Sequence, residues 1–207
     1  MHFNCQHQHE CGSFFPSLTK PFQSAYAARD KMSLCKAARK GSISSCRQLL
    51  AAGSDVEERD EDGWTPLLNA AYFGHTEVCE LLLEKGKANI EEMEPLGNTA
   101  LNIAADKGDA STVALLLSKG GRVDTRTKNS FTPLLAAAQE GHTEVCETLF
   151  EKGSDLEESS PITQMTALHY AAINGDESLL QLLVKYSKRT FLLREGIRKT
   201  FSRVQRM

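Results

Sequence analysis

The sequence predicts an all-α solenoid, in which similar helical hairpins stack in a row. The first observation is a period of 33 or 34 residues that separates five glycines: Gly41, Gly74, Gly108, Gly141 and Gly175. The second is a near duplication, GHTEVCELLLEKG at 74–86 and GHTEVCETLFEKG at 141–153. Self-similarity at a fixed period of this size is the signature of an array of stacked repeats.

The first helix of each period is expected to begin at a threonine. The four segments are TPLLNAAYFG from Thr65, TALNIAADKG from Thr99, TPLLAAAQEG from Thr132 and TALHYAAING from Thr166. Threonine can cap a helix, and proline is tolerated in the first helical turn. The leucines and paired alanines that follow give a narrow apolar face, and the glycine ends the helix near a left-handed position.

A second helix is expected after each mid-period glycine. In the second period, Leu81 and Leu82 follow Val78 by three and four residues, which places all three on one helical face. The same pattern recurs in the other periods. Neither helix could bury its apolar face alone, so stability must come from stacking against neighbouring repeats.

The repeats resemble the ankyrin repeat family, through the Thr-Pro-Leu start, the Ala-Ala-x-x-Gly-His middle and the Leu-Leu-x-x-Gly end. The resemblance covers about residues 30 to 190. It implies two antiparallel helices, a β-turn and a hairpin-like loop per unit, stacked into a curved solenoid. The five units are 30–61, 62–95, 96–128, 129–162 and 163–190. His169 keeps the histidine that the family usually places after Thr-Pro-Leu, and the other units replace it with Cys35, Leu68, Asn102 and Leu135.

Repeat length varies by one residue between the second glycine of a unit and the next threonine. Twelve positions separate Gly53 from Thr65, whereas thirteen separate Gly86 from Thr99. Loops on one face of repeat proteins commonly absorb such variation. We therefore expect the extra residue in the loops and no change in helix stacking.

The two ends of the chain differ from the repeats. Residues 1–29 have no steady period, and we expect them to be mostly disordered. Residues 191–207 form a basic segment, and from Lys185 onward eight Lys or Arg stand against one Glu. The apolar residues of this end step by three or four: Leu193, Ile197, Phe201 and Val204. This spacing is typical of a basic amphipathic helix. Such a helix could cap the last repeat, dock on an acidic partner, act as a calmodulin-like target or bind an anionic membrane surface.

Charge and cysteine content narrow the class of protein. Between Asp30 and Val184 there are 14 basic and 25 acidic residues, which argues against nonspecific nucleic-acid binding by the repeats. We find no secretory signal and no run of apolar residues long enough for a membrane span. Six cysteines in such a chain favour a reducing compartment, and we expect the cytosol or the nucleus.

Two groups of cysteines have different expected roles. Three share one place in the period, where Val and Leu stand in other repeats, so we expect small apolar packing residues there: Cys46, Cys79 and Cys146. The N-terminal segment carries four side chains of types that bind Zn²⁺: Cys5, His7, His9 and Cys11. Their spacing matches no common structural zinc pattern, so we favour a tail over a metal site and predict no metal or cofactor.

No catalytic pattern emerges from the sequence. His75 and His142 fall on equivalent positions of the period, which favours a structural role at a helix start. There is no phosphate-binding loop with its lysine and no H-E-x-x-H motif. We therefore expect a protein that is not an enzyme and has no small-molecule substrate.

The candidate binding residues come from two places in the period. The two residues before each mid-period glycine are expected to face a partner, and so is the residue before each threonine, which we expect at a loop tip. Ten of these positions form the candidate site: Arg39, Lys40, Trp64, Tyr72, Phe73, Asp106, Lys107, Phe131, Gln139 and Glu140. Aromatic anchors dominate interface energies. The aromatic residues Trp64, Tyr72, Phe73 and Phe131 are therefore the favoured docking residues. The alternative is that these rings only pack against the loop of a neighbouring repeat.

These observations predict a non-catalytic interaction module, an adaptor or scaffold, that binds a protein partner on its concave face and loops. A pre-ordered surface loses little entropy on binding, so a few desolvated anchors can set the affinity. We expect a monomer. The alternative is that the repeats form the regulatory portion of a larger or truncated signalling or catalytic protein.

Overall fold

The computed structural model describes residues 32–187, and residues 1–31 and 188–207 lie outside that description. The predicted tail at 1–29 and the basic segment at 191–207 therefore lie outside the described residues. The described part begins a stack of helical pairs at Ser33. The all-α repeat architecture predicted from the period is confirmed. Within the described range, β-pairing is limited to an isolated antiparallel bridge between Ser159 and Thr166.

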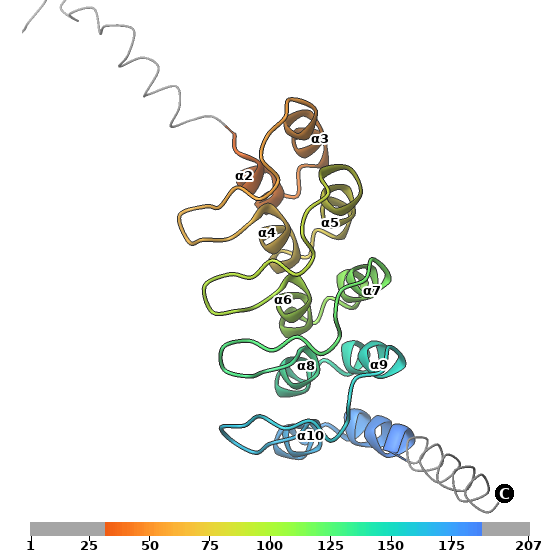
Figure 1. The fold of residues 1–207 in the computed structure, drawn as a ribbon. Helices are drawn as coiled ribbons and strands as arrows, with labels where there is room; N and C mark the ends of the chain where they lie inside the picture. The colour runs from red at the N-terminus through yellow and green to blue at the C-terminus, as the bar shows by residue number, and fades with distance from the viewer. Residues whose placement is uncertain (1–31, 188–207) are drawn as a thin grey trace, which may run out of the picture. The chain divides into compact units, whose positions relative to one another are not determined.

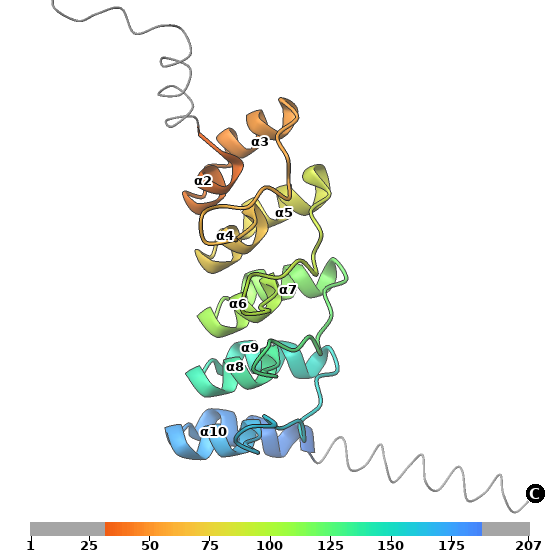
Figure 2. The same ribbon diagram turned by 60° about the vertical axis from the view of Figure 1, so that its left-hand side comes forward.

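The helices form two columns (Figure 1). The first helices of the repeats are α2 (Leu34–Arg39), α4 (Pro66–Tyr72), α6 (Ala100–Lys107), α8 (Pro133–Glu140) and α10 (Ala167–Asn174). The second helices are α3 (Ile43–Ala51), α5 (Thr76–Leu81) continued by the π-helical η1 (Leu82–Gly86), α7 (Ala110–Ser118), α9 (Thr143–Glu151) and the helical residues 177–187. The connecting loops extend from the first-helix column on the side away from the second helices. Figure 2 shows the same pairs stacked layer on layer.

Local capping explains where the first helices begin. The Thr65 hydroxyl accepts a hydrogen bond from the Leu68 amide, and Thr99 and Thr132 cap their helices in the same way. His169 Nδ1 accepts a hydrogen bond from the Thr166 amide at 3.2 Å, at the start of α10. Asn102 Oδ1 makes the equivalent bond to Thr99 at 3.2 Å, because an amide oxygen can occupy the same place as the ring nitrogen.

The core is a continuous row of small and medium apolar side chains between neighbouring repeats. Paired alanines let the first helices approach closely, and the six in α4, α6 and α8 are fully buried: Ala70, Ala71, Ala104, Ala105, Ala137 and Ala138. Leucines fill the space between the columns, and burial of each stabilises the fold by about 1.5 to 3 kcal/mol. Helix α4 packs against α2 and α6, and α6 packs against α8. Each interior repeat therefore depends on both neighbours for its stability.

The predicted packing role of the periodic cysteines is confirmed. Cys46, Cys79 and Cys146 are fully buried free thiols, and Cys35 is also buried. Burial raises the pKa of the Cys79 and Cys146 thiols to about 12, and the nearby carboxylate of the next repeat adds to the shift in each case. These thiols stay protonated at neutral pH and behave as small apolar residues.

The extra residue of the second repeat is not in the loop, which corrects the expectation from the sequence. Leu82–Gly86 forms a wider π turn, and the left-handed position that ends the helix falls on Lys87, with φ of 61°. In the fourth repeat the corresponding left-handed residue is Gly153, with φ of 93°. Gly86 instead allows close approach, because a Cβ there would lie 2.8 Å from Val56 Cγ2.

The other long repeat does place its extra residue in the loop. In the first and third loops, hairpin hydrogen bonds join Asp60 N to Trp64 O and Thr127 N to Phe131 O, each at 3.0 Å. In the fourth loop the bond joins Ser160 N to Met165 O at 2.9 Å, so its turn is one residue longer. The extra residue is therefore accommodated by a π turn in the second repeat and by a longer loop turn in the fourth, although the spacing in the sequence is the same.

The last described repeat exposes part of its packing face. Leu168 is 50% exposed, whereas the equivalent Leu67, Leu101 and Leu134 are at most 3% exposed because the next repeat covers them. The prediction that residues 191–207 cap this face stays a prediction, since that segment lies outside the described residues.

Candidate functional site

Hydrogen bonds between repeats fix the ends of the first helices, where most candidate residues lie. His75 Nε2 donates to the Arg39 carbonyl at 3.2 Å, and His142 Nε2 donates to the Asp106 carbonyl at 3.0 Å. Each ring also packs on the glycine of the preceding repeat, so that a Cβ on Gly41 or Gly108 would overlap it. The histidines therefore lock adjacent repeats together, in keeping with the structural role expected for them.

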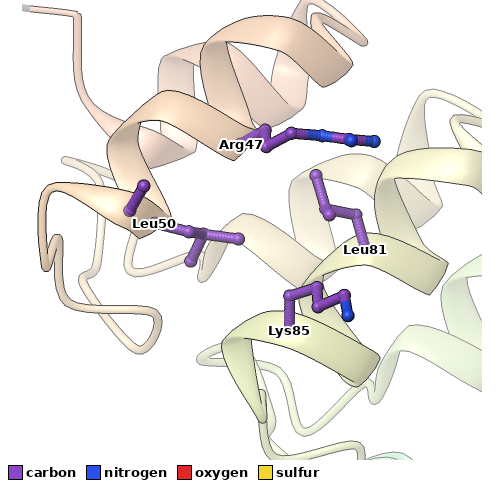
Figure 3. A pocket seen from close by; sticks show the side chains of 5 residues that line it. Arg47, Leu50, Leu81 and Lys85 are labelled. Atoms are coloured by element: carbon purple, nitrogen blue, oxygen red, sulfur yellow. The ribbon is translucent and has the colours of Figure 1, made fainter.

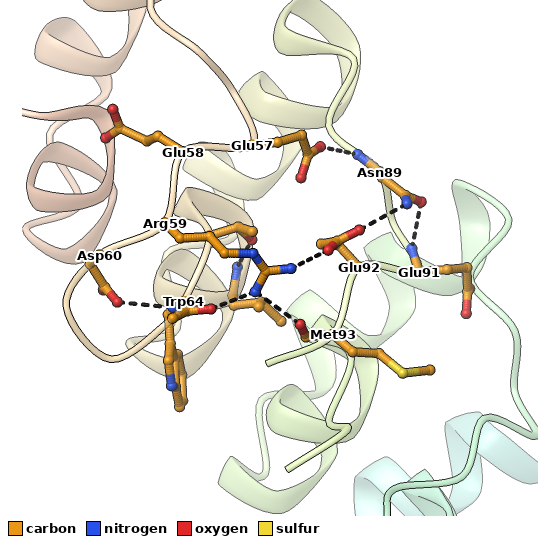
Figure 4. Close-up of polar contacts among 12 residues, drawn as sticks. Glu57, Glu58, Arg59, Asp60, Trp64, Asn89, Glu91, Glu92 and Met93 are labelled. Carbon is orange, nitrogen blue, oxygen red and sulfur yellow. Dashed lines mark hydrogen bonds and ion pairs between the residues drawn. The ribbon is translucent and has the colours of Figure 1, made fainter. Parts of the chain in front are cut away.

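A second set of contacts holds the loops side by side (Figure 4). Arg59 donates to the Gly63 carbonyl at 2.6 Å and to the Met93 carbonyl at 3.1 Å, and it pairs with Glu92 of the next loop. The Asn89 amide donates to Glu57 at 2.6 Å. Arg126 repeats the role of Arg59 two repeats later, by pairing with Glu158. These contacts give the loop side of the stack a defined shape.

Three aromatic side chains of the second repeat form one cluster. Trp64 meets Tyr72 edge-on with ring centroids 5.3 Å apart, and Tyr72 meets Phe73 edge-on at 5.0 Å. Trp64 is half-buried and packs against the core, whereas Tyr72 and Phe73 are 40% and 42% exposed. Such an exposed pair of rings beside a fixed tryptophan is the kind of anchor that interfaces use.

Cations from the two adjoining repeats flank this cluster. The Arg39 guanidinium lies 5.3 Å from the Phe73 centroid, and the Lys107 ammonium lies 4.8 Å from the Tyr72 centroid. Both are within cation–π range. The hydrogen bond that the Lys107 ammonium donates to the Asp106 carboxylate raises the pKa of Lys107, and the Asp106 and Glu140 charges act in the same direction. We call Arg39, Trp64, Tyr72, Phe73 and Lys107 the aromatic strip.

The remaining candidates lie around the aromatic strip or apart from it. Asp106 pairs with Lys107 at 3.0 Å, and Gln139 and Glu140 are exposed at the end of α8. Lys40 is exposed at the end of α2. Phe131 is half-buried and lies against Tyr170 of the next repeat, with centroids 6.2 Å apart.

The prediction that the residue before each threonine lies at a loop tip is wrong. Because the Trp64 carbonyl accepts the Asp60 amide, the turn itself consists of residues 61–63, and Trp64 lies on the returning arm. The same bond places Phe131 on the returning arm of the third loop. The turns expose other apolar residues, with Leu96 65% and Ile162 73% exposed.

Sequence reasoning missed Arg59 and the cation contacts of Arg39 and Lys107. A signal for Arg59 was present, because Arg59 and Arg126 each stand six positions before a threonine that starts a helix. The cation contacts carried no such signal, since they join residues of different repeats.

Neither a metal centre nor a membrane span is found between residues 32 and 187. No group of three or more His, Cys, Asp or Glu in that range is placed to hold a metal ion. No helix in that range is long and apolar enough to cross a bilayer. The candidate ligands Cys5, His7, His9 and Cys11 lie outside it.

Comparison with known proteins decides the family. A family model described as ankyrin repeats (3 copies) matches residues 34–127 and, in an overlapping placement, 102–192. The chain belongs to the ankyrin repeat family. Ankyrin repeats generally serve as protein-interaction modules, and the described stack has the paired helices and projecting loops of that family.

Ankyrin repeat relatives of this chain are much longer proteins. The transient receptor potential cation channel subfamily A member 1 homolog of Caenorhabditis elegans is 34% identical over 149 residues, which cover 71% of this chain and 12% of that protein. The ankyrin repeat and KH domain-containing protein mask-1 of the same species is 37% identical over 163 residues, 75% of this chain and 6% of that protein. Protein fem-1 homolog A-like of Mus musculus is 37% identical over 107 residues, 52% of this chain and 16% of that protein.

Proposed function

We propose that this chain is a non-catalytic adaptor or scaffold that binds a protein partner through the aromatic strip. The partner would bury Tyr72 and Phe73 and place carboxylates near Arg39 and Lys107. Arg39 also lines a hollow of about 360 Å³ between α2 and the first loop, which extends the surface toward the loops. A surface already held by the histidine and arginine contacts would lose little entropy on binding.

The observation that carries this proposal is an internal comparison. Residues 64–86 and 131–153 differ at only six positions, and two of these differences replace Tyr72 and Phe73 by Gln139 and Glu140. Both pairs are exposed at the ends of equivalent helices, α4 and α8. The fold therefore accepts polar residues at these places, so packing alone does not explain the two rings.

The same comparison supplies the test, a double variant Tyr72→Gln/Phe73→Glu that borrows residues from the fourth repeat. Affinity capture with the wild-type chain and quantitative mass spectrometry would identify partners, and calorimetry would measure binding of each purified partner. Loss of anchors of this kind costs about 2 kcal/mol or more, so we expect binding about 30-fold weaker.

A matched control is Ile162→Gln, which removes exposed apolar surface from the fourth loop and leaves the aromatic strip intact. Its affinity should equal that of the wild type. If the strip variant keeps its helical circular dichroism and binds every partner as tightly as the wild type, the proposed site is refuted.

A second candidate function is regulation within a larger protein. The lengths of the relatives favour it, since the chain covers only 6 to 16% of the three described above. An immunoblot with an antibody against the repeats would detect a species much longer than 207 residues if this is so. A single band at the size of this chain would contradict it.

The cytosol or nucleus and a monomeric state complete the proposal. The four described cysteines are free, which supports a reducing compartment. Light scattering on the purified chain would test the monomer, and an observed dimer mass would contradict it.

A further inference from the structure

A pocket opens on the opposite column of helices, between the second helices of the first two repeats (Figure 3). Its volume is about 340 Å³, and it is lined by Arg47, Leu50 and Ala51 of α3, Leu81 of α5 and Lys85 of η1. Leu50 and Leu81 are half-buried and form the apolar part of the lining. Figure 3 shows Arg47 and Lys85 on either side of the two leucines.

Both charged side chains that line this pocket, Arg47 and Lys85, are cations, although the repeats as a whole are acidic. The two acids of the neighbouring helix surface, Glu80 and Glu84, face Lys119 of the third repeat at 4.0 and 2.6 Å. Arg47 and Lys85 form no ion pair with any residue in the described range 32–187. Two cations without ion pairs beside an apolar floor favour a ligand that combines carboxylates with an apolar side chain.

The pocket also has a feature that the repeat framework does not require. The π turn at Leu82–Gly86 carries Lys85, and π turns occur frequently at functional sites. In the third and fourth repeats Ala114 stands where Arg47 stands, and Thr148 stands where Leu81 stands. Glu80 and Glu147 stand at the place of Arg47 in the second and fourth repeats. The combination of a cation on one wall with an apolar group on the other is therefore found only between the first two of the described repeats.

We propose that this pocket is a second docking site, for an acidic segment of a partner protein in which one Leu, Ile, Phe or Met is flanked by Asp and Glu. The apolar side chain enters between Leu50 and Leu81, and the flanking carboxylates face Arg47 and Lys85. The site lies on the second-helix column and is separate from the aromatic strip, so its ligand does not depend on that proposed site.

The probe is an array of short peptides, each with one of these four apolar residues flanked by Asp and Glu. One control array replaces the flanking acids by Lys, and a second replaces the central apolar residue by Ser. We expect the full chain to bind the acidic peptides better than both controls, and more weakly at high salt because the attraction between exposed charges is screened. Failure of every acidic peptide to exceed the controls would overturn the proposal.

Two variants locate the binding. Arg47→Ala/Leu81→Thr copies the residues of the third and fourth repeats, which fold with them, and should weaken peptide binding by about tenfold or more. Arg47→Glu/Lys85→Glu keeps the leucines and should abolish binding of acidic peptides while improving binding of the Lys-flanked ones. Tyr72→Gln/Phe73→Glu should bind the array like the wild type, which separates this site from the aromatic strip.

Methyl resonances of Leu50 and Leu81 provide a readout that does not depend on mutation. They should shift when the best acidic peptide is added. Peptide binding that leaves these resonances unchanged, or that survives both pocket variants, would refute the assignment.

Discussion

Replacement of Gly108 by Ala should destabilise the stack much more than the same replacement at Gly141. Both glycines end a first helix in the interior of the stack, with nearly equal φ of 74° and 79°. A Cβ at Gly108 would lie 2.6 Å from His142 Nδ1, whereas the nearest atom at Gly141 is Asp176 Oδ2 at 3.9 Å. The pair therefore separates the backbone cost of a left-handed alanine from the steric cost of displacing the ring.

The magnitudes follow from these contacts. A left-handed non-glycine residue costs about 1 to 2 kcal/mol, which is the whole expected effect at Gly141. At Gly108 the ring must also move, with loss of the His142 hydrogen bond to Asp106 at about 1 kcal/mol and overpacking at about 1 to 3 kcal/mol. We expect Gly108→Ala to cost about 2 to 3 kcal/mol more than Gly141→Ala.

Urea unfolding followed by circular dichroism measures both free energies, and equal m-values would show that the same structure unfolds. A double-mutant cycle with His142→Ala isolates the contact, because Gly108→Ala should cost no more than Gly141→Ala once the ring is absent. Equal costs for the two glycines in the presence of His142, or a Gly108 penalty unchanged without it, would refute this reasoning.

Two further predictions concern the cysteines and the π turn. Burial raises the pKa of Cys79 and Cys146 from the ordinary 9.0 to about 12, so unfolded thiols ionise first and stability should fall as pH rises above 9.0. Urea unfolding midpoints measured below and above pH 9.0 test this expectation. The variant Cys79→Val/Cys146→Val should lose much of the dependence of stability on pH. The same pH dependence in this variant as in the wild type would contradict the argument. Lys87→Gly should stabilise the fold by about 1 kcal/mol, because it relieves a left-handed lysine. Lys152→Gly, at φ of −91°, should instead lower the melting temperature, and a lower melting temperature for Lys87→Gly would contradict the strain argument.

The period and the helix starts could be predicted because local rules determine them. Thr65, Thr99 and Thr132 each precede an apolar segment, and threonine in such a place caps a helix. The paired alanines of α4, α6 and α8 are small enough for close packing of neighbouring helices. The sequence also placed Tyr72 and Phe73 on the surface, since both follow the last buried turn of a helix.

The spacing of the glycines alone does not predict where each long repeat places its extra residue, but the position of the turn-forming Asn or Asp does. Asn89 accepts the Glu91 amide at 3.1 Å, and Asp155 accepts the Glu157 amide at 3.0 Å, so both start the same kind of turn. Asp155 follows Gly153 by two residues, whereas Asn89 follows Gly86 by three. The additional residue therefore precedes the turn in the second repeat and follows it in the fourth.

The composition of the candidate site could be predicted only in part. Arg39 and Lys107 reach the rings from adjoining repeats, and that contact depends on how far the helices are offset from each other. The pocket between Leu50 and Leu81 depends on the same offset. Period and spacing give the order of the repeats along the stack, but they do not give these lateral distances.

The π turn at Leu82–Gly86 limits how the repeats can be recombined. The segments 74–86 and 141–153 look interchangeable in the sequence, yet one ends with a glycine pressed against Val56 and the other with a glycine in open space. The difference follows from where the next turn begins, and the residues that begin it are Asn89 and Asp155, downstream of the two segments. A chimaera built by swapping modules should therefore have its junctions beyond these two residues, so that each helix end travels with the turn that follows it.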